Sequence, residues 1–250
     1  MLNEFSRTEL LIGKKALEKL SRSKIAIFGL GGVGTYAAEG LARAGIGRFV
    51  LVDHDRICLT NINRQLHATI KTVGKPKVEV MRERILDINP GAEVIASQVF
   101  YTPECAPELV RQEYDYIIDA IDTVTSKIDL ILNARRQGIP IISCMGAGNK
   151  LDPTKFQITD IYDTSVCPLA RVMRRELRKR GVTSLKVVYS QEEPLKPRDY
   201  NDSNCRHDCI RPESAGKSRT ICRQVPGSIS FVPSVAGLLM AAEVVKDLIN

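Results

Sequence analysis

The chain has 250 residues, and its 44% hydrophobic and 26% charged residues are typical of a folded globular protein, not of a disordered one. Lysine and arginine number 36 against 29 acidic residues, so the formal net charge at pH 7 is +7. Residues 167–223 hold 14 basic and 7 acidic residues, while the remainder of the chain is neutral. The sequence is therefore a neutral body with one basic block, which needs an explanation.

The sequence contains no run of about 18 apolar residues, the length that would predict a membrane span. Its first residues lack the apolar core and cleavage site of a signal peptide. We therefore predict a cytoplasmic protein without a membrane partner. The seven cysteines, an odd number without a signal peptide, argue against a disulfide framework.

Apolar patterns predict strands and helices in alternation along the chain. Helices are expected at residues 8–20 with a break near Gly13, and at 35–44, 76–88, 103–113 and 125–137. Strands are expected at 25–28, 48–52, 94–99, 116–121 and 140–144, with further strands near 156–161 and 185–189. Residues 194–227 are interpreted as a long loop, and 232–249 as a closing helix. This order predicts an α/β, Rossmann-like fold of three layers, in which the sheet is mostly parallel and mixed at its edge.

A glycine-rich turn joins the first predicted strand to the helix that follows, with glycines at Gly29, Gly31, Gly32 and Gly34. Glycines allow the backbone to approach a phosphate, and the start of a helix offers unpaired N–H groups to it. Asp53 ends the next strand, where an acid can hold ribose hydroxyls. The turn predicts a nucleotide site, although glycines that serve only tight packing are the alternative. By itself it does not separate a dinucleotide dehydrogenase from an ATP-using enzyme.

Charged and amide residues follow the turn in an order that favours ATP. They are Asp55, Asn61, Arg64, Gln65, Lys77 and Asp122. Arginine and lysine side chains give charge-assisted contacts to a triphosphate, and hydride transfer requires no such pair. A carboxylate at a strand end can hold Mg²⁺ beside the phosphates. Each residue alone could be structural, so the prediction depends on the ordered set.

The order of these motifs resembles the ThiF/MoeB and ubiquitin-activating superfamily of adenylating enzymes over about residues 4–142. The resemblance implies that ATP lies at the glycine turn and that Asp53 holds its ribose. It implies that Arg64 and Lys77 contact the phosphates and that Asp122 positions Mg²⁺. The remaining residues of the set, Asp55, Asn61 and Gln65, would help to form the site.

The resemblance also implies a homodimer. The opening tract with Arg7 and residues 10–13 matches the family, in which an arginine reaches the ATP site of the partner subunit. Arg7 is therefore a candidate catalytic residue in trans. A solvated arginine near the N-terminus is the alternative.

The second half of the chain resembles one group of this superfamily, the tRNA threonylcarbamoyladenosine dehydratases (TcdA, or CsdL). The resemblance is carried by residues 143–150, 152–155, 168–171, 188–194 and 227–237. It implies ATP-dependent dehydration and cyclisation of the threonylcarbamoyl group on adenosine 37 of tRNA, through an acyl-adenylate. The chain would then be a single adenylation domain over 1–250. Its parts would be an ATP-binding body at 1–166, a basic helix and long loop at 167–227, and a closing helix at 228–250.

The basic block contains a candidate surface for tRNA. Apolar residues at Leu169, Val172, Met173 and Leu177 share one face of a predicted helix. The remainder is covered by Arg171, Arg174, Arg175, Arg178, Lys179 and Arg180. Such a cluster is typical of a surface that binds a polyanion, and a solvated helix face is the alternative.

The cysteines leave several interpretations open. Cys205, Cys209 and Cys222, with His207, offer thiolate and imidazole ligands for Zn²⁺, but they lack the paired CxxC arrangement of many relatives, and reduced loop cysteines are the alternative. A monovalent cation is a further open possibility. Cys58, Cys144 and Cys167 could each be interpreted as a nucleophile by analogy with thioester-forming relatives, but core packing is favoured for Cys58 and Cys144. Cys167 precedes the proline of residues 168–171, where this group is expected to have an aspartate, so the role of that position is open.

Three other functions compete with the dehydratase. The first is an activator of a ubiquitin-like sulfur-carrier protein, which the absent CxxC pairs and the basic helix disfavour. The second is an NAD(P)-dependent oxidoreductase, which Arg64, Lys77 and Asp122 disfavour. The third is a non-catalytic, nucleotide-dependent tRNA-binding module. A sulfur-relay protein is a further candidate partner.

Overall fold

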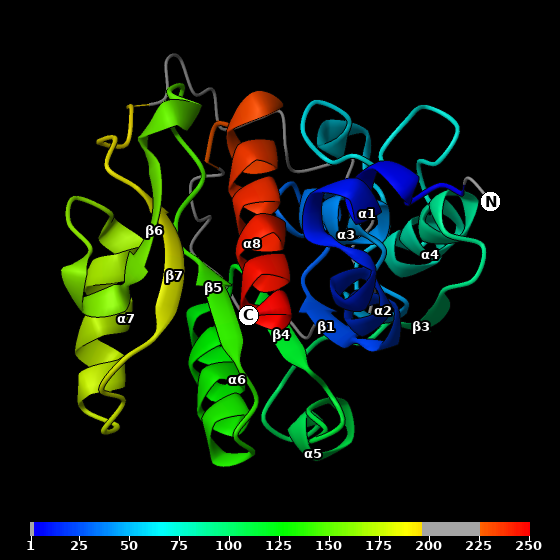
Figure 1. Cartoon of the computed structure of the whole chain (residues 1–250). Coiled ribbons are helices and arrows are strands. Elements are labelled where there is room, and N and C mark those ends of the chain that lie inside the picture. Colours follow the sequence, from blue (N-terminus) through cyan, green and yellow to red (C-terminus); the bar gives the residue numbers. More distant parts are fainter. Residues whose placement is uncertain (1–2, 197–225) are drawn as a thin grey trace.

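The computed structural model describes residues 3–196 and 226–250, and its centre is a seven-stranded sheet (Figure 1). The strands are β1 (Lys24–Phe28), β2 (Arg48–Val52), β3 (Glu93–Ser97), β4 (Tyr116–Asp119), β5 (Ile141–Cys144), β6 (Phe156–Asp160) and β7 (Lys186–Ser190). The helices are α1 (Ser6–Ile12), α2 (Lys14–Arg22), α3 (Gly34–Ala44), α4 (Lys77–Ile88), α5 (Ala106–Leu109), α6 (Val124–Arg136), α7 (Pro168–Arg178) and α8 (Phe231–Ile249). The described residues also form three short 3₁₀ turns, η1 (Leu59–Asn61), η2 (Pro153–Lys155) and η3 (Ile161–Asp163).

The strand order is β3-β2-β1-β4-β5-β7-β6. All neighbouring strands are parallel except β6, which pairs antiparallel with β7 at the edge. The chain adds strands on one side of β1 as far as β3 and then returns to place β4 on its other side. In such sheets, ligands bind outside the carboxyl ends of the strands at this point of reversal. The predicted mixed-edge, mostly parallel sheet is confirmed.

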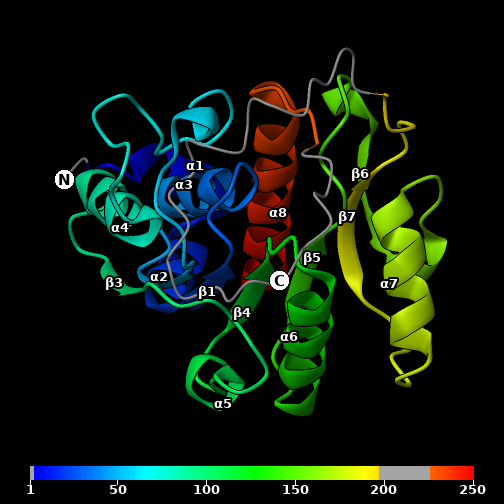
Figure 2. The same cartoon turned by 180° about the vertical axis from the view of Figure 1, so that it is seen from behind.

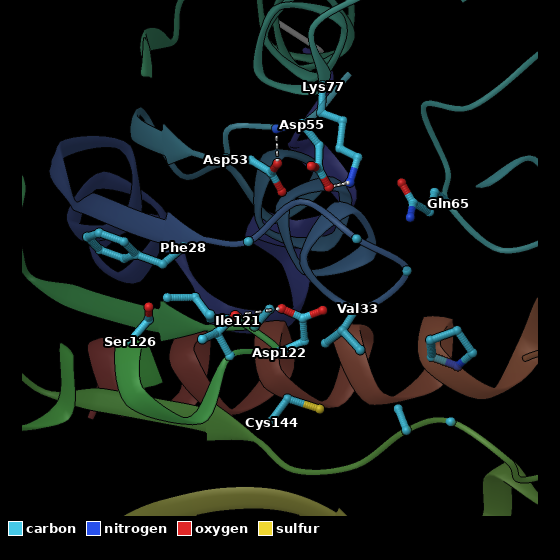
Figure 3. A pocket seen from close by; sticks show the side chains of 18 of the residues that line it. Phe28, Val33, Asp53, Asp55, Gln65, Lys77, Ile121, Asp122, Ser126 and Cys144 are labelled. Atoms are coloured by element: carbon cyan, nitrogen blue, oxygen red, sulfur yellow. Dashed lines mark hydrogen bonds and ion pairs between the residues drawn. The ribbon is translucent and has the colours of Figure 1, made fainter. Parts of the chain in front are cut away.

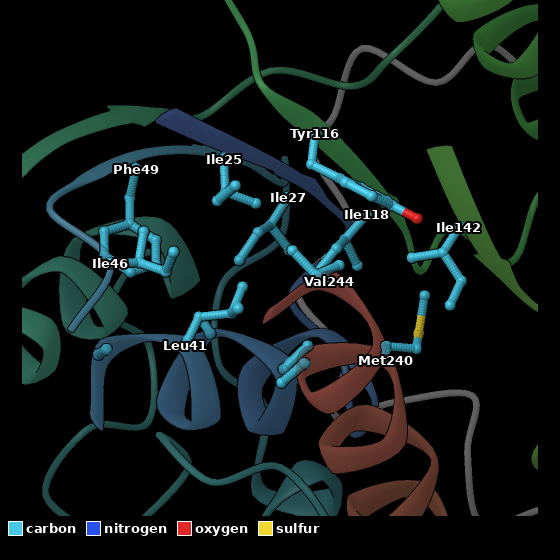
Figure 4. Packing of buried hydrophobic residues seen from close by; sticks show 14 of the residues in the cluster. Ile25, Ile27, Leu41, Ile46, Phe49, Tyr116, Ile118, Ile142, Met240 and Val244 are labelled. Atoms are coloured by element: carbon cyan, nitrogen blue, oxygen red, sulfur yellow. The ribbon is translucent and has the colours of Figure 1, made fainter. Parts of the chain in front are cut away.

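Alternate residues of the central strands enter two different cores, because successive side chains of a strand point to opposite faces. Ile25 and Ile27 of β1 pack with α3, α4 and α8 (Figure 4). Ala26 and Phe28 pack on the other face with α5 and α6. A further cluster joins α6 and α7 to β7. The sheet therefore lies between two layers of helices, as Figures 1 and 2 show from opposite sides, and the predicted three layers are confirmed.

Most predicted boundaries agree with the structure to within two or three residues. The expected break near Gly13 separates α1 from α2, and the φ of +83° at this position suits glycine. The helix predicted over 103–113 is wrong: α5 has only the four residues Ala106–Leu109. Val110 already has an extended backbone, and with Tyr114 it packs into the core beside the sheet. These core contacts stabilise the extended backbone after Leu109, so the helix does not continue. Within the described residues, no helix combines the length and apolarity needed to cross a membrane.

Candidate functional site

A cavity of about 660 Å³ lies at the carboxyl ends of the strands, beside the reversal between β1 and β4 (Figure 3). This volume falls within the range of small-molecule sites in proteins. Ten of the predicted nucleotide-site residues line it together: Gly29, Gly31, Gly32, Asp53, Asp55, Asn61, Arg64, Gln65, Lys77 and Asp122. Gly34 and Arg7 do not line it. Residues that are up to 93 positions apart in the sequence therefore face one space.

The glycine turn is shaped by contacts that exclude a side chain. Gly29 has a φ of +89°, and a Cβ there would lie 2.6 Å from the Ala120 carbonyl oxygen. A Cβ at Gly34 would lie 1.8 Å from the Gly29 carbonyl oxygen, so Gly34 serves the packing of the turn. Gly31 is different, because among the described residues only the Gln65 amide nitrogen would come within 4.0 Å of a Cβ there. Its backbone is therefore open to a ligand in the cavity.

The end of β2 holds two carboxylates with different partners. Asp53 is buried and accepts hydrogen bonds from the backbone N–H groups of Leu30 (2.6 Å) and Asp55 (2.8 Å). It therefore ties β2 to the glycine turn. Asp55 forms an ion pair with Lys77 at 2.7 Å, and the Lys77 side chain is 6% exposed against 48% for Asp55. Figure 3 shows this pair above the turn, on the cavity side.

The segment after β2 supplies a cation and two amides. The Arg64 guanidinium donates to the Thr60 carbonyl oxygen and to Asn63 Oδ1, both at 2.9 Å, and burial lowers the pKa of this guanidinium. Asn61 Oδ1 accepts from the Cys58 N–H, which caps η1. The buried Gln65 Oε1 has no hydrogen-bond partner in the described part of the chain. An unpaired buried oxygen is costly, so this amide is suited to a donor brought by a ligand.

Asp122 is the acidic group best suited to a cation. It is exposed, and within the described residues its Oδ1 accepts a single long bond of 3.4 Å, from Thr123 Oγ1. Potential ligand atoms of Asp53, His54 and Asp55 also lie within 4.8 Å of one another. However, the Asp53 carboxylate already accepts hydrogen bonds from backbone N–H groups, and the Asp55 carboxylate already pairs with Lys77 and His54. Figure 3 shows the Asp122 carboxylate in the cavity between the turn and Cys144. The free carboxylate, the cationic side chains and the open turn together fit Mg²⁺ and a triphosphate.

One apolar wall of the cavity consists of residues that were not among the predicted site residues. It comprises Phe28, Val52, Val99, Phe100, Tyr101 and Ile121. Phe28 and Tyr101 meet edge to face, with ring centroids 5.3 Å apart. Val99 ends the predicted strand 94–99, and Phe100 and Tyr101 directly follow it. The rule that ligands lie at the carboxyl ends of parallel strands could therefore have found them.

The residues of the opposite wall were also not among the predicted site residues, and this wall lies beneath the start of α7. Its residues include Met145, Gly146, Ala147, Gly148 and Leu169. Cys144 closes the floor, and burial raises the pKa of its thiol to about 12, so the sulfur stays protonated near neutral pH. Cys167 is 1% exposed. A buried, protonated thiol at Cys144 is a poor nucleophile, which agrees with the prediction that this residue packs in the core.

Helix α7 buries a narrower stripe than predicted. Ala170, Met173 and Leu177 face the core, whereas Val172 is 36% exposed and Leu169 is half-buried at the cavity. Positions 170, 173 and 177 follow the helical repeat, and the small Ala170 permits close approach to the layer below. The start of α7 therefore belongs to the cavity wall, and its outer side remains available.

The six basic residues of α7 and its C-terminal end differ in their partners. Arg174 donates to the carbonyl and hydroxyl oxygens of Thr164. Arg178 lies over the Tyr162 ring, 5.1 Å from its centroid. Arg175, Lys179 and Arg180 surround Glu176, and hydrogen bonds from Arg180 first and Lys179 second lower the pKa of that carboxyl to about 2. Within the described residues, Arg171 alone of the six has no such partner.

The basic surface continues onto the neighbouring helix. A shallow cavity of about 550 Å³ lies between the ends of α6 and α7, lined by Leu132, Arg135, Arg136, Arg180, Gly181 and Val182. Arg135 donates to the Ser184 carbonyl oxygen, and Arg136 donates to Asn133 Oδ1. We call this the arginine groove. Two arginines of α6 and Arg180, which follows α7, therefore meet at one depression.

One predicted feature, Arg7, does not line the cavity, and another falls outside the described residues. Arg7 is exposed on α1, a helix without a buried residue, on which Leu10 and Leu11 are 88% and 86% exposed. The candidate zinc ligands Cys205, Cys209 and Cys222 fall outside the described residues.

The sequence and the fold are similar to those of known proteins. The ThiF family model matches residues 5–250. The chain is 48% identical to the tRNA threonylcarbamoyladenosine dehydratase of Bacillus subtilis (strain 168), over 100% of this chain and 96% of that protein. It is 36% identical to the enzyme of the same name from Escherichia coli (strain K12), over 98% of this chain and 92% of that protein. The crystal structure of E. coli tRNA N6-threonylcarbamoyladenosine dehydratase, TcdA, in complex with ATP matches with a TM-score of 0.84 and 35% identity, covering 98% of this chain and 93% of that one.

Proposed function

The chain belongs to the ThiF family, and from that premise we propose that it is an ATP-dependent tRNA threonylcarbamoyladenosine dehydratase. The reaction dehydrates and cyclises the threonylcarbamoyl group on adenosine 37 of tRNA. The similarity to two enzymes of this name over almost the whole chain supports this proposal.

One structural observation carries the proposal. The cavity is lined on one side by the glycine turn, Arg64, Lys77 and Asp122, and on the other by Leu169, in the first turn of the basic helix α7. A nucleic acid that lies on α7 would therefore bring its reacting group to the same space as ATP. A small-molecule substrate would require no basic helix at this wall.

ATP would occupy the cavity with its phosphates at the turn. Gly31 offers open backbone, Arg64 and Lys77 offer positive charge, and Asp53 offers a carboxylate to the ribose. Asp122 would hold Mg²⁺, which neutralises charge on the phosphates. The apolar wall at Phe28 would take the base, and the remaining members of the set, Asp55, Asn61, Gln65, Gly29 and Gly32, would shape the site.

The chemistry requires activation of a carboxylate, which is a poor electrophile. The threonyl carboxylate attacks the α-phosphorus of ATP, and pyrophosphate leaves as an acyl-adenylate forms. The carbamoyl group then attacks the activated carbonyl carbon, displaces AMP and closes the ring, so that one water is lost overall. Positioned cations stabilise the charge that develops at phosphorus, and the shared cavity brings the two reactants together.

The tRNA would lie along α7 and the arginine groove. Arg171 is exposed at the cavity end of this surface, and Arg136 is exposed at the other end. An α-helix rises about 1.5 Å per residue, so α7 places its two ends about 16 Å apart. A phosphate backbone that follows α7 would therefore contact both ends while its reactive nucleotide enters the cavity.

A homodimer is part of this proposal. Arg7 would reach the ATP site of a second copy, and the exposed Leu10 and Leu11 of α1 offer an apolar face for that contact. Zn²⁺ at Cys205, Cys209 and Cys222, a monovalent cation, a sulfur-relay partner and a cytoplasmic location stay as predictions.

The proposal is tested by measuring the AMP and pyrophosphate that the protein forms from ATP. Purified protein with Mg²⁺ and ATP is incubated with tRNA that carries threonylcarbamoyladenosine, with the same tRNA lacking the modification, or with a small sulfur-carrier protein that ends in glycine. We expect AMP and pyrophosphate only with the modified tRNA. The variant Lys77→Ala should reduce AMP formation by about a hundredfold or more, because a charge at the developing transition state is lost. Lys75→Ala, which changes an exposed lysine two positions earlier, is the matched control.

Two results would contradict the proposal. AMP formation that depends on the carrier protein would assign the chain to sulfur-carrier activation. Unchanged AMP formation in Lys77→Ala would remove this lysine from the site.

A further inference from the structure

A charged cluster lies beneath the cavity floor without lining it. Lys127 of α6 and Asp119 of β4 form an ion pair at 2.9 Å, and both side chains are 0% exposed. Ser143 of β5, also 0% exposed, donates its hydroxyl hydrogen to Asp119 Oδ2 at 2.6 Å. None of the three is among the cavity-lining residues. Three elements that meet at the floor are therefore joined by one polar cluster.

The cluster holds the backbone that leads to Asp122. The Lys127 ammonium donates to the carbonyl oxygens of Ile121 (3.1 Å) and Asp119 (3.5 Å) as well as to the Asp119 carboxylate. Asp119 Oδ1 accepts from the Ile121 N–H at 3.2 Å. Both polar backbone groups of Ile121 are thus bound from below. Asp122 is the next residue, and its carboxylate stands in the cavity (Figure 3).

The same backbone supports the glycine turn. The Ala120 N–H donates to the Phe28 carbonyl oxygen at 2.8 Å. The Ala120 carbonyl oxygen lies 2.6 Å from the position that a Cβ of Gly29 would take. A shift of residues 119–121 would therefore move both the carboxylate of Asp122 and the turn at Gly29.

Stability alone does not account for such a cluster. Removing two charges from water is costly, and apolar residues of similar volume are often as stabilising as a buried pair. A buried ion pair also fixes geometry, because its directional hydrogen bonds hold the surrounding backbone and side-chain groups in place. We propose that Lys127 and Asp119 are positioning residues that set the Asp122 carboxylate and the glycine turn at the spacing Mg·ATP requires. This inference rests on the proposed ATP-dependent function.

The test removes the charges together. Lys127→Met alone would leave the Asp119 carboxylate buried without a counter-charge, and the fold itself would suffer. The double variant Asp119→Asn/Lys127→Met removes both charges. The asparagine oxygen can still accept from the Ile121 N–H, and its amide nitrogen then faces the Ser143 hydroxyl, which can accept as well as donate. Ser143→Ala is a milder second variant that loses one hydrogen bond to Asp119. Affinity for Mg·ATP is measured by calorimetry, amide hydrogen exchange at residues 119–123 is measured without nucleotide, and thermal unfolding is recorded for each protein.

We expect the double variant to unfold near the parent temperature, to exchange residues 119–123 faster and to bind Mg·ATP about tenfold to a hundredfold more weakly, because a small misplacement is costly at such a site. Ser143→Ala should change exchange and affinity in the same direction and by less. If the parent binds Mg·ATP and a folded variant keeps both its affinity and its exchange pattern, the positioning role is refuted. If the double variant does not fold, unchanged affinity and exchange in Ser143→Ala refute it. If the parent itself does not bind Mg·ATP, the proposed function fails instead.

Discussion

His67 is a buried histidine close to Lys77, the lysine that we propose for the ATP site, and its environment predicts a stability that depends on pH. It is 4% exposed, and burial first and the Lys77 charge second lower its pKa to about 4. A histidine in the unfolded chain titrates near pH 6.5. Between these values the unfolded state binds a proton that the folded state does not. The free energy of unfolding should therefore fall as the pH is lowered from about 6.5 to about 4, by up to roughly 3 kcal/mol.

The variant His67→Leu isolates this contribution. It has no imidazole to protonate, so its free energy of unfolding should decline less than that of the parent across the same window. Urea unfolding at pH 7 and pH 4.5 measures the difference for both proteins. Equal declines in parent and variant would show that other groups control the acid sensitivity.

For the helix α7, the sequence predicted that a helix forms but not which of its residues face the core and which face the cavity. The apolar spacing over 169–177 is helical, and the structure confirms the helix. Periodicity alone did not identify Ala170 as a core residue, because alanine carries little apolar signal. It also did not show that Leu169 faces a cavity, because that depends on β5 and the segment after it. For α5, local polarity suggested a helix, and packing against the sheet overrode it.

The arginine groove and the exposed Arg171 form the surface that we propose for tRNA, so reversing charges on it should weaken tRNA binding. The double variant Arg171→Glu/Arg136→Glu reverses one exposed residue at each end of the basic surface. We expect tRNA affinity to fall by about tenfold or more, with a smaller dependence on salt, because fewer counterions are released on binding. Lys19→Glu/Arg22→Glu makes the same charge change on α2, which lies on the other face of the sheet. Filter binding at several salt concentrations compares the three proteins.

Equal loss of affinity in both double variants would attribute binding to net charge alone. Full affinity in Arg171→Glu/Arg136→Glu would return α7 to the interpretation of a solvated helix face.

At the scale of the whole molecule, the strand order explains which site residues sequence reasoning could find. Gly29, Asp53, Lys77 and Asp122 stand in a recognisable order along the chain, and the parallel sheet gathers them at one edge. Phe28 ends β1 and Met145 follows β5, and β4 lies between these two strands, a neighbour relation that has no local signal in the sequence. The continuous sheet also supports our proposal of one adenylation domain over 1–250, with its ATP-binding body at 1–166, the basic segment at 167–227 and the closing helix at 228–250.

The central claim concerns a change in one nucleoside. The purified protein is incubated with Mg²⁺, ATP and tRNA that carries threonylcarbamoyladenosine. The tRNA is then digested to nucleosides under mild conditions, and the nucleoside masses are measured by mass spectrometry. We predict that threonylcarbamoyladenosine is converted to a product lighter by one water, and only when ATP is present. A nucleoside of unchanged mass, from protein shown to bind ATP and tRNA, would contradict the account.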